Sequence, residues 1–348
     1  MKKNITLKDI AKELQLSVST VSRALRDNYQ IGDATKTKVL NYAKEHHFIH
    51  NRMARSLKEG KSRTIGVIVC SLDNVYVSQM LDGIDNYCTG QEYQIIIMQS
   101  KELQEQEDAC IHLLYASGID GLLISPAYQN TDFAELKTLQ KAGLPIVLFD
   151  RLSDHIESNK VASNNFKGAY EATLHLIKNG YRKIAHINTN TELSITTERL
   201  NGYLKALKDN HITYKAEYVH YYDYSKGNLE GIIDRLMTLP DPPHALFTAT
   251  DQITTKCVSI LSKSPYHVPE DLAFIGFSNT DLADAFNPPL TTVNQPAFEI
   301  GKIAAQKLIK NIEQPNYNPG FETILLESEI QYRASTRERT QSDRLPSP

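Results

Sequence analysis

Short apolar runs rich in Ile and Val recur along most of this chain, and they constrain its fold more than any other feature. Four lie within residues 64–150 and three within residues 183–278: TIGVIVCS, QIIIMQS, DGLLISP and PIVLFD, then KIAHINT, ALFTATD and LAFIGFS. Stretches with helical patterns separate them. Near-continuous apolar strands that alternate with helices are typical of parallel sheets covered on both faces. We therefore expect an α/β body of two lobes over residues 64–335.

Polar residues follow several of these expected strands. They are Ser125, Asp150 and Arg151, Thr250 and Asp251, and Ser278 and Asn279. One polar residue at a strand end is more often a helix cap than a ligand contact. Ligands of open α/β sheets nevertheless bind at the carboxyl ends of the strands. Several such residues facing one cleft between the lobes therefore predict a binding site.

Charge is distributed unevenly along the chain. The net charge of all 348 residues is −3, yet residues 1–63 hold 14 Lys and Arg against 6 Asp and Glu, and the later residues hold 24 against 35. A basic head on an acidic body is typical of a nucleic-acid-binding module joined to another domain. A solvated basic face would give the same charge. The choice between this interpretation and a nucleic-acid-binding module therefore depends on the residue pattern of the head.

The head begins with two short amphipathic segments in LKDIAKELQLSVSTVSRAL, residues 7–25. Thr6 precedes the first as an N-cap candidate, with Asp9 three residues on, as in a capping box. The apolar residues of this segment fall at helical spacing: Leu7, Ile10, Ala11 and Leu14. Ser17 can cap a second helix, which we expect to run from Val18 to Arg26.

The second segment has two distinct faces. Val21 and Leu25 are expected to face inward, and the opposite face presents small polar and basic side chains: Val18, Ser19, Ser22, Arg23 and Arg26. A third helical pattern covers residues 33–47 and turns Val39, Leu40 and Ala43 inward. Three small helices with short side chains on the second predict a helix-turn-helix domain over residues 1–50 that reads double-stranded DNA in the major groove. The alternative is an ordinary helical hairpin.

Residues 51–63 join the head to the body. The sequence NRMARSL, residues 51–57, could form two helical turns with Leu57 as an apolar side chain among basic residues, suited to insertion between base pairs from the minor groove. So short a helix is unstable in water without a partner. The same residues could also be a linker.

These residues resemble the lac repressor/gal repressor family of bacterial transcription regulators. TLKDIAKELQLSVSTVSRAL is similar to the family's DNA-binding headpiece and NRMARSL to its hinge helix, and the likeness extends to about Tyr332. The resemblance assigns base reading to Val18, Ser19 and Arg23, phosphate contacts to Thr20 and Ser22, and the minor-groove contact to Leu57. Thr6, Asn51 and Arg55 complete the expected DNA-contacting set. His50 departs from the Pro usual before the Asn.

The resemblance also implies a small effector between the two lobes. Asp150 and Arg199 match its charged contacts, and Tyr76 matches an aromatic ring over the ligand. Asp251 is typical of the family, whereas Thr250 and Ser278 replace a frequent Asn and Asp. Ser125 joins this expected set as a strand-end residue. A carboxylate and an Arg suit vicinal hydroxyls, so a sugar or sugar derivative is expected, with a phosphorylated or acidic effector left open.

Other classes of protein fit the sequence less well. It has no apolar run of membrane-spanning length and no apolar stretch near its start like that of a signal peptide. The four cysteines are widely spaced, which suggests reduced thiols and a cytoplasmic protein without metal or cofactor: Cys70, Cys88, Cys110 and Cys257. A sugar-binding protein or a cleft enzyme without a regulatory role is the alternative, although GxSxG, P-loop and HExxH motifs are absent.

The last expectations concern assembly and the C-terminus. The family resemblance implies a homodimer, and two headpieces imply a palindromic operator. Residues 336–348 are polar, end with two prolines and lack apolar heptads, so they are expected to be a disordered tail. The sequence leaves open the operator, the identity of the effector, and whether the effector releases the protein from DNA or recruits it to DNA.

Overall fold

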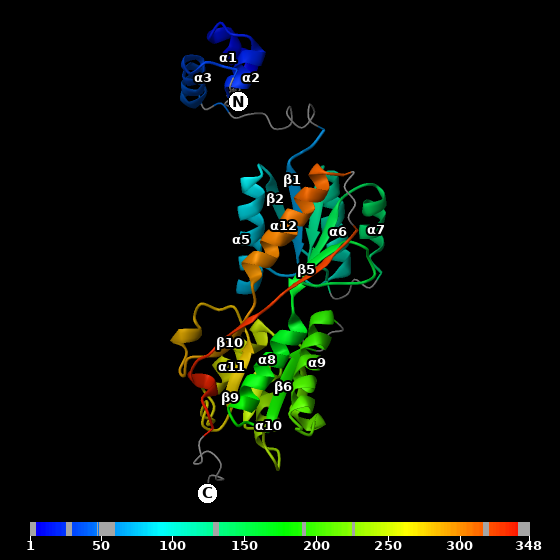
Figure 1. Ribbon diagram of the computed structural model, residues 1–348, viewed down its shortest axis with the longest axis vertical. Coiled ribbons are helices and arrows are strands. Elements are labelled where there is room, and N and C mark those ends of the chain that lie inside the picture. The colour runs from blue at the N-terminus through cyan, green and yellow to red at the C-terminus, as the bar shows by residue number, and fades with distance from the viewer. Residues whose placement is uncertain are drawn as a thin grey trace. The chain divides into compact units, whose positions relative to one another are not determined.

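The computed structural model describes residues 5–25, 30–46, 48, 60–127, 132–189, 193–224, 227–315 and 320–339. The chain divides into two compact units, Met1–Ser62 and Arg63–Pro348. Figure 1 shows a small helical unit and a larger unit built from two α/β lobes. Within the described residues, no helix is both long and apolar enough to cross a membrane.

The first unit contains three short helices, α1 (Leu7–Glu13), α2 (Val18–Ala24) and α3 (Asp33–Glu45). Both expected N-caps are present: Thr6 and Asp9 form a capping box, and Ser17 accepts a hydrogen bond from the backbone N–H of Thr20 at 3.0 Å. The helices bury a small common core: Ile10, Ala11, Leu14, Val21, Ala24, Val39 and Ala43. The expectation that Leu40 points inward is wrong, because its side chain is 48% exposed. Adjacent positions on a helix lie about 100° apart, and this core is too small to take both Val39 and Leu40.

The N-terminal lobe of the second unit is built on a fully parallel six-stranded sheet with the order β11-β5-β4-β3-β1-β2. Its strands are β1 (Thr64–Val69), β2 (Gln94–Gln99), β3 (Gly121–Ile124), β4 (Ile146–Phe149), β5 (Asn159–Ser163) and β11 (Thr323–Leu326). Helices α5 (Val75–Gly90) and α12 (Ala297–Glu313) cover one face, and α6 (Gln104–Ala116) and α7 (Ala134–Lys141) cover the other. Because both faces are covered, β3 and β4 are apolar throughout and β1 is apolar after Thr64.

The C-terminal lobe repeats this plan with the strand order β12-β10-β9-β8-β6-β7. Its strands are β6 (Ile184–Thr189), β7 (Val219–Tyr222), β8 (Ala245–Thr248), β9 (Ala273–Phe277), β10 (Thr291–Asn294) and β12 (Glu329–Gln331). Helices α8 (Asn165–Lys178) and α9 (Ser194–Asp209) pack on one face, and α10 (Leu229–Met237) and α11 (Asp251–Leu261) on the other. The expected two-lobed parallel architecture is confirmed, with one difference: the edge strand β12 is antiparallel to β10.

The chain crosses between the lobes three times, from β5 to α8, from β10 to α12 and from β11 to β12. As a result α12 follows a strand of the C-terminal lobe but packs beside α5 in the N-terminal lobe (Figure 1). The two helices approach closely at glycines: a Cβ at Gly83 would meet the backbone of Phe298, and a Cβ at Gly301 would meet the backbone of Met80. Two of the crossings are tied together by the hydroxyls of Ser163 and Ser328, 2.8 Å apart.

The described C-terminal residues end in a packed segment. Thr336 is 2% exposed and its hydroxyl lies 2.7 Å from Nε2 of His175, while the Tyr181 hydroxyl donates to the carbonyl of Arg337. The expectation of a disordered tail is therefore wrong for residues 336–339, whose backbone and hydroxyl groups are taken up by the C-terminal lobe. Residues 340–348 lie outside the described residues.

Candidate functional site

A cavity of about 540 Å³ lies between the two lobes of the second unit. Its wall combines residues that follow β1, β3 and β4 in the N-terminal lobe with residues that follow β6, β7, β8 and β9 in the C-terminal lobe. The cavity therefore lies at the carboxyl ends of both sheets, where open parallel sheets bind ligands. Its volume is in the range of small-molecule sites.

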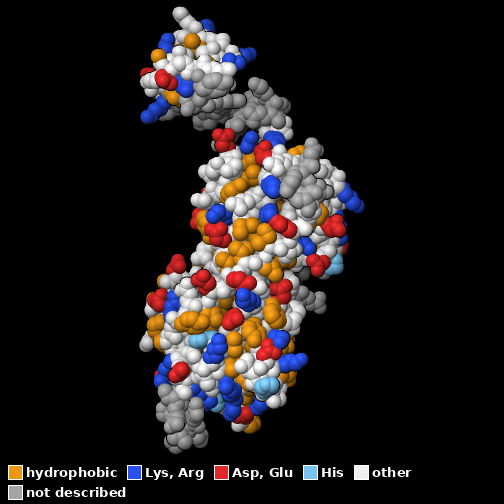
Figure 2. Space-filling view, in the orientation of Figure 1, with side chains coloured by type: hydrophobic (Ala, Val, Ile, Leu, Met, Phe, Trp, Pro, Cys, Tyr) orange, Lys and Arg blue, Asp and Glu red, His pale blue; other side chains and the backbone are white. Residues whose placement is uncertain are grey.

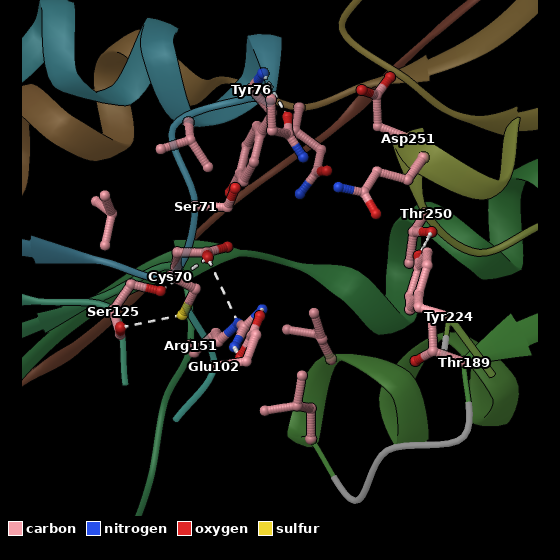
Figure 3. Close-up of a pocket in the computed structure, with 18 of the residues that line it drawn as sticks. Cys70, Ser71, Tyr76, Glu102, Ser125, Arg151, Thr189, Tyr224, Thr250 and Asp251 are labelled. Carbon is pink, nitrogen blue, oxygen red and sulfur yellow. Dashed lines mark hydrogen bonds and ion pairs between the residues drawn. The ribbon is translucent and has the colours of Figure 1, made fainter. Parts of the chain in front are cut away.

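Three of the expected effector contacts lie in the N-terminal wall, namely Tyr76, Ser125 and Asp150. Figure 3 shows Tyr76 and Ser125 in this wall. Asp150 follows β4 directly and has a left-handed backbone (φ 64°), and its carboxylate accepts a hydrogen bond from the Ser125 hydroxyl at 3.0 Å. Burial raises the pKa of Asp150, and the nearby charge of Arg151 and the Ser125 hydroxyl oppose this rise. Burial and then the charge of Asp150 raise the pKa of the Tyr76 phenol well above its ordinary value, so this hydroxyl keeps its proton.

Arg199 lines the same cavity from α9, but its guanidinium is held by the protein. Nε and Nη2 donate to Oδ1 of Asn165 at 2.9 and 2.7 Å, and Nη1 donates to the carbonyl of Ala249. The guanidinium also lies 3.8 Å from the ring centre of Phe277. Burial lowers the pKa of Arg199 to about 10, so the side chain remains charged at neutral pH. The position of Arg199 in the cavity wall is compatible with a ligand contact. Its hydrogen bonds to Asn165 and Ala249 also give it a structural role in the protein.

The remaining expected residues lie around the N-terminus of α11. Thr250 caps this helix and its hydroxyl lies 3.0 Å from that of Tyr224, and Asp251 is the first helical residue. Both line the cavity, whereas Ser278 does not. Ser278 is buried (2% exposed), and its hydroxyl donates a hydrogen bond to Oδ1 of Asp251 from outside the cavity wall. Ser278 thus orients a cavity residue, and a direct ligand contact is not available to it in this arrangement.

The cavity wall also includes Arg151 and Asn279, two of the polar strand-end residues that the sequence indicated, although they were not among the expected effector contacts. Other charged and polar residues of the wall were not expected, among them Glu102, Asp223, Tyr224 and Gln295. Glu102 and Gln295 lie in connections between strand and helix, where neither periodicity nor composition marks them.

Two buried polar atoms of residues in this wall have no hydrogen-bond partner among the described residues, Nε of Arg151 and Nε2 of Gln295. The buried Tyr76 hydroxyl interacts with the carboxyl group of Asp150. A buried polar group without a partner costs about 1–3 kcal/mol, so native structures leave few of them. Two such atoms beside one cavity favour a polar occupant over an apolar one.

Hydrogen bonds join the two lobes beside the cavity. Nδ2 of Asn279 donates to Oε1 of Gln79 at 2.7 Å, and Nε2 of Gln79 donates to the carbonyl of Asn279 at 3.4 Å. Elsewhere the Ser194 hydroxyl donates to the carbonyl of Leu152 at 3.3 Å. These contacts join the walls of the cavity across the two lobes.

The expected DNA-reading residues lie on one side of α2. Val18, Ser19 and Arg23 are exposed, and Thr20 and Ser22 are partly exposed beside them. Thr6 is exposed at the N-terminus of α1. The hydroxyls of Ser19 and Thr20 lie 2.7 and 2.8 Å from that of Ser17, so the cap also positions this face. Asn51, Arg55 and Leu57 lie outside the described residues.

The surface of the second unit offers no comparable DNA-binding face in the view of Figure 2. Lys and Arg side chains alternate there with Asp and Glu. DNA binding draws most of its affinity from continuous basic surface against phosphates. The face of the second unit seen in Figure 2 agrees with the electrostatic asymmetry of the sequence, which points to the first unit for DNA binding.

A helix-turn-helix unit joined to a two-lobed α/β core with an interlobe cavity defines a DNA-binding regulator with a periplasmic-binding-protein-like core. Comparison with known proteins agrees. Residues 6–51 match the family described as "Bacterial regulatory proteins, lacI family", and residues 173–336 match a "Periplasmic binding protein-like domain".

Relatives of known function cover nearly the whole chain. The HTH-type transcriptional repressor PurR of Aliivibrio salmonicida is 30% identical over 313 residues, which cover 90% of this chain and 93% of the relative. The ribose operon repressor of Haemophilus influenzae is 31% identical over 336 residues, which cover 95% and 98%. The chain therefore belongs to the lacI family of bacterial regulatory proteins, and it is a transcriptional regulator rather than an enzyme.

Solved structures share the fold. The lac repressor dimer bound to operator and the anti-inducer ONPF has a TM-score of 0.81 at 23% identity, covering 96% of this chain and all of that one. A LacI family transcriptional regulator from Enterococcus faecium with bound ribose has a TM-score of 0.70 at 26% identity, covering 80% of this chain and all of that one. A further neighbour is a complex of the regulator CelR with cellobiose, with a TM-score of 0.71 at 24% identity.

Proposed function

We propose that this protein is a homodimeric repressor that binds a palindromic operator and whose operator affinity is set by a small carbohydrate in the interlobe cavity. The observation that carries the proposal is the interlobe cavity of about 540 Å³, whose wall combines charged and amide side chains from the strand ends of both lobes. A cavity that served only as packing space would be lined by satisfied or apolar groups.

The chemistry of the wall favours a sugar. Asp150 and Asp251 offer carboxylate oxygens, and Gln295 and Arg151 offer donors, so neighbouring hydroxyls can both donate and accept. The ring of Tyr76 provides an apolar face for the carbon skeleton. The related ribose operon repressor and the neighbours crystallised with ribose and cellobiose support the same ligand class.

The DNA half of the proposal follows from the exposed face of α2. We assign base contacts to Val18, Ser19 and Arg23 and phosphate contacts to Thr6, Thr20 and Ser22. Asn51, Arg55 and Leu57 extend this assignment on sequence grounds, with Leu57 in the minor groove. Residues 1–50 then serve as the headpiece, 51–63 as the hinge, and 64–335 as the effector-binding and dimerisation domain. We place the protein in the cytoplasm, where operator DNA is accessible.

The experiment that tests the proposal selects bound duplexes from a random DNA pool with the full-length protein and then screens sugars for a change in affinity. The expected result is a palindromic consensus and at least one sugar that changes the dissociation constant severalfold. Selection of an asymmetric site, or no response to any compound, would refute the corresponding half of the proposal.

A further inference from the structure

Arg63 is the last residue of the segment that we assign as the hinge, and its side chain joins three groups at the start of β1. Cζ lies 5.1 Å from the ring centre of Tyr93, and Nη1 lies 3.6 Å from Oε1 of Glu313. Nη1 also donates to the carbonyl of Gln91 at 3.4 Å. The Tyr93 hydroxyl donates to the same oxygen of Glu313 at 2.6 Å. We infer that these four residues, the Arg63 cluster, position the hinge and couple it to the interlobe cavity.

The backbone of Arg63 is held independently of its side chain. Its N–H donates to Oδ2 of Asp120 at 2.8 Å, and its carbonyl accepts from the N–H of Gln94 at 2.9 Å. The backbone is left-handed (φ 55°), a conformation that is uncommon outside glycine and that the surrounding structure has to enforce. The guanidinium is therefore not needed to hold the start of β1, and its contacts with the Arg63 cluster require a separate explanation.

The Arg63 cluster lies at the far ends of two helices that begin at the cavity. Tyr76 near the start of α5 lines the cavity, and Gln91 is the C-cap of the same helix. Gln295 also lines the cavity, two residues before α12 begins, and Glu313 is the last residue of α12. At 1.5 Å per residue each helix spans about 25 Å. Figure 1 shows both helices running from the interlobe side of the N-terminal lobe toward the end where β1 begins.

α5 and α12 are packed so closely that they form one rigid element. Their backbones meet at Gly83 and Gly301, and Tyr93 belongs to the same buried apolar cluster as both helices. At the cavity end, Gln79 of α5 accepts a hydrogen bond from Asn279 of the C-terminal lobe at 2.7 Å. Close-packed elements transmit displacements because they deform little. A shift between the lobes at the cavity is therefore expected to move the Arg63 cluster, and with it the entry of the hinge.

The inference rests on the proposed function and is tested with operator DNA, because coupling between two binding sites is reciprocal. Hydrogen exchange of the full-length protein is followed by mass spectrometry, with and without a saturating operator duplex from the selection above. In the wild type the operator should change the exchange rate of peptides covering residues 74–82 and 295–303 by at least about twofold. Peptides of α2 should be protected by the operator, which shows that the DNA is bound.

Two variants remove the side-chain contacts from opposite sides. Arg63→Ala keeps both backbone hydrogen bonds of this residue, and Glu313→Gln keeps an acceptor for the Tyr93 hydroxyl but removes the charge that faces Arg63. In both variants the change at residues 74–82 and 295–303 should be smaller than in the wild type, with α2 protected as before. Arg235→Ala, an exposed residue of α10, should respond like the wild type. Melting temperatures report whether each variant retains the fold.

The outcomes separate the inference from the proposed function. A wild-type response at residues 74–82 and 295–303 in either Arg63→Ala or Glu313→Gln would overturn the inference and leave the proposed function standing. No change at these residues in the wild type, with α2 protected, would overturn both the inference and the proposed control of operator affinity from the cavity.

Discussion

Replacement of Arg199 by Ala tests whether this side chain is a structural element of the cavity as well as a candidate ligand contact. Its guanidinium satisfies Oδ1 of Asn165 and the carbonyl of Ala249, both inside the protein. Arg199→Ala would leave two buried acceptors without donors. At about 1–3 kcal/mol for each unsatisfied acceptor, the free energy of unfolding should fall by about 2–6 kcal/mol.

The assay is urea unfolding of the full-length protein, followed by circular dichroism. Arg235→Ala is the matched control because Arg235 lies exposed on α10, and its loss should change the free energy of unfolding by no more than about 0.5 kcal/mol. Equal stabilities of the two variants would refute the structural part assigned to Arg199. If the expected loss is found, Arg199→Ala cannot serve as a clean test of ligand sensing, and Asp150 is the better choice.

Three further predictions concern DNA reading, pH and helix packing. Arg23→Ala should weaken binding to the selected operator by about 1–3 kcal/mol with much less effect on random DNA, and equal losses in a filter-binding assay would show that Arg23 contacts only phosphate. Burial lowers the pKa of His186 to about 3. The unfolded chain binds a proton at this side chain near pH 6.5, whereas the folded protein does not. Urea titrations should therefore show the free energy of unfolding falling below about pH 6, with this histidine contributing up to about 1.4 kcal/mol per pH unit. A flat profile between pH 7 and 5 would contradict this. Gly301→Ala should destabilise the protein by about 1–3 kcal/mol or more because the added methyl meets the backbone of α5, whereas Gly90→Ala, with nothing within 4 Å, should be neutral or slightly stabilising in the same unfolding assay.

Much of the fold was predictable because most central strands are buried on both faces and therefore have near-continuous apolar sequences. β5 is a buried strand that lacks such a sequence. Its sequence NKVAS is fully buried, yet it contains Asn159, Lys160 and Ser163. The structure accommodates these polar groups with specific partners: Lys160 pairs with Asp154 at 2.8 Å, and Oδ1 of Asn159 accepts from the N–H of Glu322. Glu322 lies 163 residues from Asn159 along the chain, and Asp154 lies in the irregular connection before β5, so neither partner leaves a local pattern.

The site was predictable to a similar degree. Six of the seven expected effector residues line one cavity, because strand ends in a parallel sheet meet at one edge. Ser278 follows its strand like the others but lies behind Asp251. The ion pair of Glu102 with Arg151, in which Oε1 and Nη2 lie 2.6 Å apart, could not be predicted, since it depends on left-handed backbones in a short loop that joins β2 to α6.

The central claim is that a ligand in the interlobe cavity sets DNA affinity, and operator titration with and without the sugar found by screening tests it most directly. The wild-type dissociation constant should change by about 5- to 150-fold at saturating sugar, which corresponds to a coupling free energy of about 1–3 kcal/mol. Asp150→Asn should bind the operator normally without sugar and show no response at the same sugar concentration. If Asp150→Asn responds as the wild type does, the ligand that controls DNA binding does not act through this cavity.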